Sequence, residues 1–280
     1  MDQKIGLIAG NGNLPVLFVD ALKARNHSVF VIAHKNETRA EIAKNADDIL
    51  WVPVGQIAAI IPYFKQHQIS EIVMAGGIPK TNLFDRVLDP SARQLVDSFK
   101  EKKDDLLLRG FASAFEKAGM KILSVTDFLP DLLAQEGEQT RPLTKSERDD
   151  IEWGWGLAKQ IGALDIGQTI VVKEGVLLAV EAVEGTDAAI RRGGQLGRSN
   201  VRVIKCLKPH QDVRFDLPTV GVQTIQTMIE ANASVLAVEA GRTLLLEKEA
   251  FLKAANEAGI AVVGWKNEPP PALAAGVPAS

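Results

Sequence analysis

Residues 4–15 read KIGLIAGNGNLP, an apolar run that passes through a glycine-rich turn to a proline. The run predicts a short strand, and Pro15 suits the first turn of a helix that we expect to reach about Arg25. Strand, glycine turn and helix in this order open a βαβ unit, so the stretch predicts an α/β fold. The backbone N–H groups of the turn suit a phosphate or a sugar, and a purely structural tight turn is the alternative.

The rest of the first half repeats this alternation. It predicts strands at 28–33, 48–53, 71–75 and 121–125, and helices at 56–66 and within 93–118. Strands that alternate with helices in this way form parallel sheets. We therefore expect residues 1–130 to form an N-terminal Rossmann-like domain with a parallel sheet.

The second half begins after a stretch rich in proline, glycine and polar residues, 131–143, which we assign to a linker. Thr144 and Glu147 have the spacing of a capping box. They predict the start of a helix that runs to about Ile161.

The pattern after this helix predicts a mixed sheet. Two β-rich runs separated by Glu174 and Gly175 have the spacing of a hairpin. Later strands are expected at 201–207, 235–238, 243–246 and 260–263, and helices at 222–232 and 248–258. We therefore expect a C-terminal α/β domain with a mixed sheet in 144–266, followed by a flexible tail in 267–280.

Composition limits the class of protein and of partner. The chain has 280 residues and a formal charge of −3 at pH 7, which gives no electrostatic footprint for nucleic acid. The single cysteine, Cys206, lies in an apolar run, which predicts a core residue and a reducing compartment. Residues 1–4 show no signal peptide, and no stretch approaches the roughly 18 apolar residues of a membrane span. We expect a soluble, cytoplasmic protein whose contact with a membrane is at most peripheral.

Several familiar site motifs are absent from the sequence. The turn at 10–15 lacks the third glycine of a dinucleotide fingerprint, and His34 and Lys35 follow the second strand where a nicotinamide site needs an acidic residue. Residues 76–81 (GGIPKT) lack the Walker spacing. The four histidines show no metal-ligand spacing with one another or with Cys206, and there is no nucleophile-elbow serine. A nicotinamide cofactor and covalent serine, cysteine or zinc chemistry are therefore disfavoured.

The stretch 208–221 reads KPHQDVRFDLPTVG and follows a predicted strand, at the edge where α/β sheets bind ligands. Lys208 and Arg214 stand beside Asp212 and Asp216 on a loop that two prolines stiffen. Two cations and two carboxylates suit phosphate chemistry. A solvated loop with local ion pairs explains the same composition, and both interpretations stay open at this point.

Carboxylates also occur in pairs elsewhere in the chain. Asp104 with Asp105, and Glu184 with Asp187, lie at predicted turns or helix starts. Hard oxygen ligands of this kind favour Mg²⁺ or Mn²⁺. Each pair is also consistent with simple helix capping, because Asp is a common N-cap residue.

Four motifs carry a family resemblance, and they are GLIAGNGNLP (6–15), KKDDLLLRG (102–110), EGTDAAIRRGG (184–194) and the stretch 208–221. In this order they resemble the LpxI-type UDP-2,3-diacylglucosamine pyrophosphatases. The similarity extends over nearly the whole chain, from Lys4 to about Gly264, and the C-terminal tail carries no family motif.

The resemblance implies a cytoplasmic enzyme of lipid A biosynthesis in a Gram-negative bacterium. Such an enzyme would hydrolyse UDP-2,3-diacylglucosamine to UMP and 2,3-diacylglucosamine 1-phosphate (lipid X), with Mg²⁺, or else Mn²⁺, as cofactor. It would have two α/β domains with the lipid bound between them. Peripheral contact with the inner membrane and a homodimer are compatible with this activity.

The resemblance also implies functional residues. The essential acidic residue of the family falls in the RFDLP segment, which makes Asp216 the candidate for catalysis and for metal binding. Asp105 and Asp187 follow as catalytic candidates that would contact the metal or the sugar. The substrate-binding positions, whose basic members would neutralise phosphate charge, are Asn11, Gly12, Gly76, Lys103, Asp104, Gln168, Glu184, Gly185, Thr186, Arg191, Lys208 and Arg214.

Two other classes of function stay open. A non-catalytic module that binds nucleotide sugars or lipids would use the same Rossmann-like domain, but it would not release UMP. An NAD(P)-dependent oxidoreductase is the second alternative, and the missing third glycine and acidic residue weaken it.

Overall fold

The computed structural model of the chain describes residues 3–78, 88–98 and 104–266, and for residues 104–107 it describes the backbone alone. The expected tail, 267–280, and Lys103 thus lie outside the described residues. The chain forms two compact units. Unit 1 comprises Met1–Leu132 and His210–Leu217, and unit 2 comprises Leu133–Pro209 and Pro218–Ser280.

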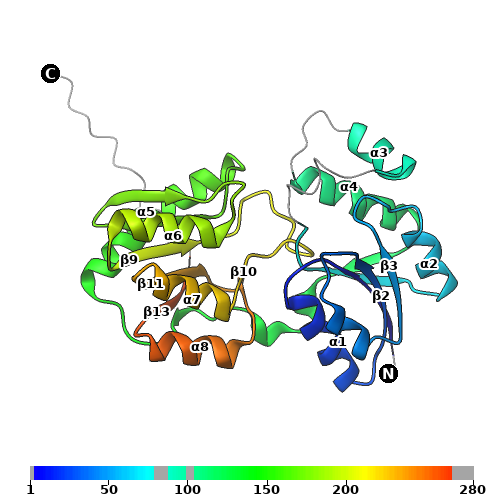
Figure 1. Cartoon of the computed structure of the whole chain (residues 1–280), viewed down its shortest axis with the longest axis horizontal. Helices are drawn as coiled ribbons and strands as arrows, with labels where there is room; N and C mark the ends of the chain where they lie inside the picture. Colours follow the sequence, from blue (N-terminus) through cyan, green and yellow to red (C-terminus); the bar gives the residue numbers. More distant parts are fainter. Residues whose placement is uncertain (1–2, 79–87, 99–103, 267–280) are drawn as a thin grey trace. The chain divides into compact units, whose positions relative to one another are not determined.

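Unit 1 is built on a five-stranded parallel sheet of order β3-β2-β1-β4-β5 (Figure 1). Its strands are β1 (Lys4–Ala9), β2 (Ser28–His34), β3 (Asp48–Val52), β4 (Glu71–Ala75) and β5 (Lys121–Leu123). The chain builds outward from β1 to β3 and then continues on the other side of β1 with β4. In open parallel sheets such a reversal of strand order marks the crevice where ligands bind.

Helices cover both faces of this sheet, as the near-continuous burial of β1 and β2 requires. The helical elements of unit 1 are α1 (Leu14–Ala24), η1 (Ala40–Lys44), α2 (Ile60–Gln66), α3 (Pro90–Asp97), α4 (Asp104–Lys117), η3 (Val125–Asp127) and η4 (Pro130–Leu132). Phe64 of α2 and Phe115 of α4 pack with Ile32 and Ile72 of the sheet in one buried cluster. Phe18 of α1 is fully buried and does not belong to this cluster.

Unit 2 contains a six-stranded mixed sheet of order β6-β13-β11-β9-β7-β8. Its strands are β6 (Gly137–Glu138), β7 (Thr169–Lys173), β8 (Val176–Val180), β9 (Val201–Lys205), β11 (Ala233–Glu239) and β13 (Ala261–Trp265), and β10 (Thr219–Val220) pairs separately with β12 (Leu244–Leu245). The central strands β9, β11 and β13 are parallel, and the flanking strands pair antiparallel. The predicted fold class, two α/β units of which the second has a mixed sheet, is confirmed.

Local sequence signals explain several boundaries in unit 2. The predicted hairpin is confirmed, and both of its turn residues, Glu174 and Gly175, have positive φ values of 50° and 72°, as a type I′ turn requires. The capping box at Thr144 and Glu147 is also present and starts α5. The stretch 131–143 contains η4 and β6, which pairs with β13.

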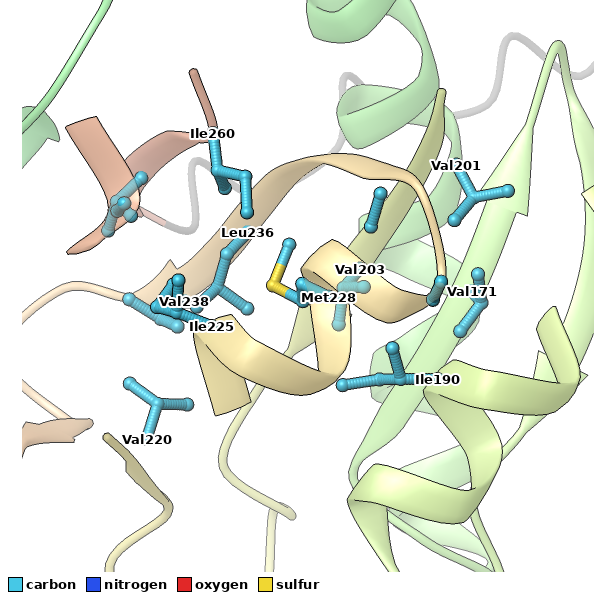
Figure 2. Packing of buried hydrophobic residues seen from close by; sticks show 14 of the residues in the cluster. Val171, Ile190, Val201, Val203, Val220, Ile225, Met228, Leu236, Val238 and Ile260 are labelled. Atoms are coloured by element: carbon cyan, nitrogen blue, oxygen red, sulfur yellow. The ribbon is translucent and has the colours of Figure 1, made fainter. Parts of the chain in front are cut away.

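The four helices of unit 2 lie on opposite faces of its sheet (Figure 1). They are α5 (Lys145–Ala163), α6 (Thr186–Gly197), α7 (Val222–Glu230) and α8 (Lys248–Glu257). Figure 2 shows Ile225 and Met228 of α7 beside Leu236 and Val238 of β11, in a cluster to which α6 and α8 also contribute. Alternate sheet residues pack against α5 on the other face, and Cys206 is buried there as predicted.

The longest helix of the described chain, α5, has 19 residues and buries only one face, with Glu147 and Asp150 among its buried residues. Within the ranges that the structure describes, no helix has both the length and the apolar character needed to cross a membrane.

Hydrogen bonds of Glu147 hold the start of α5 in place. Its carboxylate accepts hydrogen bonds from Arg141 at 2.7 and 3.0 Å and from the amide of Thr144 at 2.9 Å, and its side chain is 6% exposed. Burial alone would raise the pKa of Glu147, but these hydrogen bonds outweigh it and bring the pKa to about 2. A folded-state pKa below the ordinary 4.5 means that the carboxylate stabilises the fold above pH 4.5, and that this stabilisation is lost as the pH falls toward 2.

We therefore expect Glu147→Gln to lower the free energy of unfolding at pH 7 by about 1–3 kcal/mol, because charged hydrogen bonds are lost. The difference from the wild type should shrink as the pH falls from 4.5 toward 2. Urea unfolding across this range measures it. Asp149→Asn, which removes an exposed i,i+4 partner of Lys145 on the same helix, serves as the control and should change stability by less than about 0.5 kcal/mol. A difference that is constant with pH would contradict the prediction.

Candidate active site

The turns that follow β1 and β4 are joined at the carboxyl edge of the unit 1 sheet. The amide of Gly10 donates to Ala75 O at 2.8 Å, and the amide of Asn11 donates to Gly77 O at 2.7 Å. The side-chain oxygen of Asn11 accepts from the amide of Gly77 at 3.2 Å. These bonds place both glycine turns at the point where the strand order reverses.

Only glycine fits at two of these positions. A Cβ on Gly10 would lie 2.4 Å from Gly77 O. Gly76 has a φ of +83°, and a Cβ there would lie 2.3 Å from Asn11 O. The close approach of the two turns therefore depends on glycine, for steric reasons at both positions and for backbone conformation at Gly76.

A cavity of about 250 Å³ opens beside these turns, and all of its lining residues belong to unit 1. Its walls are mainly apolar, and α2, β4, α3 and α4 contribute Ile60, Met74, Ala92, Val96, Phe111 and Phe115 to them. Gly10, Gly76, His34 and Asp216 also line it. The cavity thus combines apolar walls with polar side chains and exposed backbone at the strand ends.

Asp216 reaches this cavity because His210–Leu217 packs with unit 1. Phe215 of this segment contacts the buried cluster of α2 and α4 and also lines the cavity. The side chain of Arg214 bonds Asp212 at 2.8 Å and Glu116 of α4 at 2.8 Å, and its guanidinium lies 5.6 Å from the ring centroid of Phe215. The hydrogen bonds from Arg214 hold the pKa of the Asp212 carboxyl below its usual range. Arg214 and Asp212 therefore fix the segment, and Asp216 lines the cavity.

A second polar cluster lies in unit 2, where α6 begins next to the end of β9. Lys205 is 5% exposed, and its Nζ donates to Thr186 Oγ1 at 2.9 Å. Thr186 Oγ1 in turn donates to Glu181 Oε1 at 2.8 Å. Burial lowers the pKa of Lys205 and raises that of the neighbouring Asp187. One buried ammonium thus interacts with two carboxyl groups, Glu181 after β8 and Asp187 in the first turn of α6.

The other predicted binding residues of unit 2 make local contacts. Glu184 pairs with Arg192 at 2.9 Å, and Arg191 pairs with Glu230 at 3.0 Å. Lys208 donates to Asp165 at 2.6 Å. The last two positions, Gln168 and Gly185, lie beside the cluster, before β7 and before α6.

Comparisons with known proteins identify the family. The family model described as the LpxI N-terminal domain matches residues 4–132, and the one described as the LpxI C-terminal domain matches residues 135–263. The chain belongs to the LpxI family. The change from one LpxI domain to the other falls next to Leu132 and Leu133, where the chain passes from unit 1 to unit 2.

A curated LpxI relative extends over nearly the same length. The UDP-2,3-diacylglucosamine pyrophosphatase LpxI of Caulobacter vibrioides is 33% identical over 276 residues, which cover 94% of this chain and 97% of the relative. Solved structures show only weak likeness. The biotin carboxylase subunit of pyruvate carboxylase matches at 14% identity and a TM-score of 0.27 over 66% of this chain and 39% of that chain. The protein gox2253 matches at 12% identity and a TM-score of 0.35, over 95% of this chain and 78% of that chain.

The structure gathers part of the predicted LpxI site in unit 1. Asn11, Gly12 and Gly76 lie in the joined glycine turns, and Asp216 lines the cavity next to them. Glu184 to Arg191, Gln168 and Lys208 belong to unit 2. Asp104 and Asp105 open α4, but their side chains and Lys103 lie outside the description. The catalytic and binding roles of all these residues stay predictions.

A metal site needs several ligands close together. In the part of the chain that the structure describes, no group of three His, Cys, Asp or Glu side chains could hold a metal ion. In phosphate-transfer sites, Mg²⁺ is commonly bound by one or two carboxylates together with substrate phosphates and water, and Asp216 is a carboxylate that lines the cavity.

Several residues of both clusters were missed by the sequence analysis. His34 is the last residue of β2 and lines the cavity. In the sequence, this position drew attention only because it lacks the acidic residue that a nicotinamide site needs. Glu181 lies just before the EGTD motif, Lys205 meets it only in space through Thr186, and neither belongs to a recognisable spacing. Position at the carboxyl end of a strand is the signal that could have found His34 and Lys205.

Substitution of Gly76 tests the junction of the two turns. Gly76→Ala should lower the free energy of unfolding by about 3 kcal/mol or more, because strain in the left-handed region adds to the clash with Asn11 O. Gly12→Ala is the matched control, since Gly12 has a similar φ of +81° but nothing lies within 4 Å of its added Cβ. Gly12→Ala should lower the free energy of unfolding by about 1 kcal/mol. If urea unfolding gave the same loss of unfolding free energy for Gly76→Ala and Gly12→Ala, the two turns would not be held rigidly at this close distance.

Proposed function

We propose that the protein hydrolyses the pyrophosphate of UDP-2,3-diacylglucosamine to UMP and 2,3-diacylglucosamine 1-phosphate, as a step of lipid A synthesis. The LpxI relative that carries the name of this activity is 33% identical over almost its full length. The observation that carries the proposal is the unit 1 cavity, in which apolar walls meet Asp216 and two glycine turns at the strand ends.

The apolar part of the cavity supports an acylated substrate. Met74, Val96 and Phe111 provide surface against which a hydrocarbon chain would be removed from water. Each buried methylene contributes about 0.8 kcal/mol, so six of them supply roughly 5 kcal/mol of binding free energy. A nucleotide sugar without acyl chains gains none of this.

The polar end supports phosphate chemistry. The amides of Gly10, Asn11 and Gly77 bond within the joined turns, so the N–H groups suited to phosphate oxygens are those that follow them, where α1 begins. Asp216 has the chemistry to orient a water or to hold a cation. We propose Mg²⁺, with Mn²⁺ as a substitute, bound by Asp216 together with phosphate oxygens and water. Such an ion would neutralise the charge that develops on the phosphate groups.

The experiment is a UMP-release assay on the full chain with UDP-2,3-diacylglucosamine and Mg²⁺. UMP should appear, disappear with a chelator, and return when Mg²⁺ or Mn²⁺ is added in excess. UDP-N-acetylglucosamine, which lacks the long acyl chains, should react poorly. Binding of the diacyl substrate without UMP release would instead indicate a non-catalytic module.

A further inference from the structure

His34 is buried at the polar end of the unit 1 cavity. It is the last residue of β2, the strand next to β1, and it lines the same cavity as Asp216 and the glycines that follow β1 and β4. Its exposed fraction is 5%. An imidazole therefore lies at the strand ends where the proposed function places the phosphate groups.

The backbone fixes the orientation of this imidazole. His34 Nδ1 lies 2.9 Å from Ala9 O, and a carbonyl oxygen only accepts hydrogen bonds, so Nδ1 carries the proton. Thr38 supports the arrangement from both sides, because its hydroxyl donates to the same carbonyl at 2.6 Å and accepts from the His34 amide at 2.8 Å. In the neutral ring, Nε2 is then the nitrogen that accepts a proton.

We propose that His34 is a catalytic residue of the pyrophosphate hydrolysis, and that its Nε2 takes a proton from the attacking water. This inference rests on the proposed function. The water oxygen forms a bond to phosphorus while one of its protons passes to Nε2. The bond from that phosphorus to the bridging oxygen breaks, and its electron pair stays on the leaving phosphate. The bond from Nδ1–H to Ala9 O is kept throughout and stabilises the imidazolium that forms.

One structural role of His34 is the hydrogen bond from Nδ1 to Ala9 O. The two roles can be separated because Asn can supply an amide N–H at the position of Nδ1 but has no group at Nε2. With a purely structural role, His34→Asn keeps its activity. With the catalytic role, it keeps its fold and loses turnover.

The test compares kcat and KM for UMP release, and the melting temperature, in the wild type and His34→Asn. We expect kcat to fall about 100- to 10,000-fold, with KM within about threefold. Imidazole added to His34→Ala should restore part of the activity, which a structural role would not allow. His67→Asn is the control, because His67 belongs to unit 1 but pairs with Asp48 and stacks on Phe30 without lining the cavity. It should keep kcat.

A His34→Asn variant that folds and retains more than a third of the wild-type kcat overturns the inference. If neither variant folds, ¹⁵N NMR of the wild type decides, and a proton bonded to Nε2 in the neutral ring overturns it. A wild type that releases no UMP defeats the proposed function itself, whereas an active wild type with an active His34→Asn defeats only the role of His34.

Discussion

Asp216→Asn is expected to lower kcat for UMP release by about 100- to 10,000-fold, because a carboxylate that orients water or holds a cation becomes a neutral amide. The variant should still fold. Asn has nearly the same size, and the contacts of Arg214 with Asp212 and Glu116, which fix the segment, remain. Turnover and the melting temperature, measured on the same preparation, give the result.

Asp212→Asn is the matched control in the same segment. Its carboxylate accepts three side-chain hydrogen bonds from Arg214, so its loss should cost roughly 1 kcal/mol of stability while the folded protein keeps kcat within about fivefold. If Asp212→Asn were as inactive as Asp216→Asn, the effect would be one of segment placement and not of the Asp216 carboxylate.

The Mg²⁺ dependence of Asp216→Asn separates its two candidate roles. If Asp216 holds the cation, the variant should need much more Mg²⁺ for half of its remaining activity. If Asp216 only orients water, the half-saturating Mg²⁺ concentration should stay near that of the wild type. A titration of both proteins with Mg²⁺ distinguishes the two.

Local patterns were sufficient to predict most elements of this fold. Pro15 after a glycine turn indicated the start of α1, Thr144 and Glu147 indicated the start of α5, and Glu174 with Gly175 indicated the hairpin. Each of these features depends on residues within a few positions of one another. The fold class followed from their order along the chain.

The place of the segment 210–217 could not be predicted in this way. Its position along the chain predicts that it belongs to 144–266, whereas in the structure it packs with unit 1 through Phe215 and the pair of Arg214 with Glu116. Glu116 lies 98 residues from Arg214 in the sequence, so no local pattern connects them. Contacts between residues that are distant in the sequence determine where this segment packs.

The candidate site also combines features that have a local sequence pattern with features that depend on distant residues. The turns that contain Asn11, Gly12 and Gly76 could be predicted, because glycine turns after strands have a recognisable sequence. The apolar walls of the cavity were not found, because they combine residues from α2, α3, α4 and β4, and no sequence spacing connects these four elements. His34 was not predicted as a site residue for a related reason. Its hydrogen bond to Ala9 O and its place in the cavity depend on residues that are distant from it in the sequence.

Filling the apolar part of the cavity should change which substrates the enzyme accepts. Ala92 on α3 is 1% exposed and lines the cavity, and Ala92→Leu would place three further carbon atoms there. If the cavity holds an acyl chain, kcat/KM for a long-chain substrate should fall about 10- to 200-fold, the range for misfit in apolar pockets. Substrates with short chains should react within a few-fold of the wild-type rate, because their chains end before the filled region. Stability should stay the same or rise, since added side-chain volume occupies empty space.

Ser91→Leu is the control for this experiment, since it adds a similar side chain at the neighbouring, exposed position of the same helix. It should leave kcat/KM unchanged for long and short chains alike. The measurement is kcat/KM for a series of substrates that differ only in acyl length, with each variant. If Ala92→Leu lowered kcat/KM equally for all lengths, the cavity would have to bind another part of the substrate. If it changed none of them, the acyl chains would lie elsewhere, and the apolar walls would not bind the substrate.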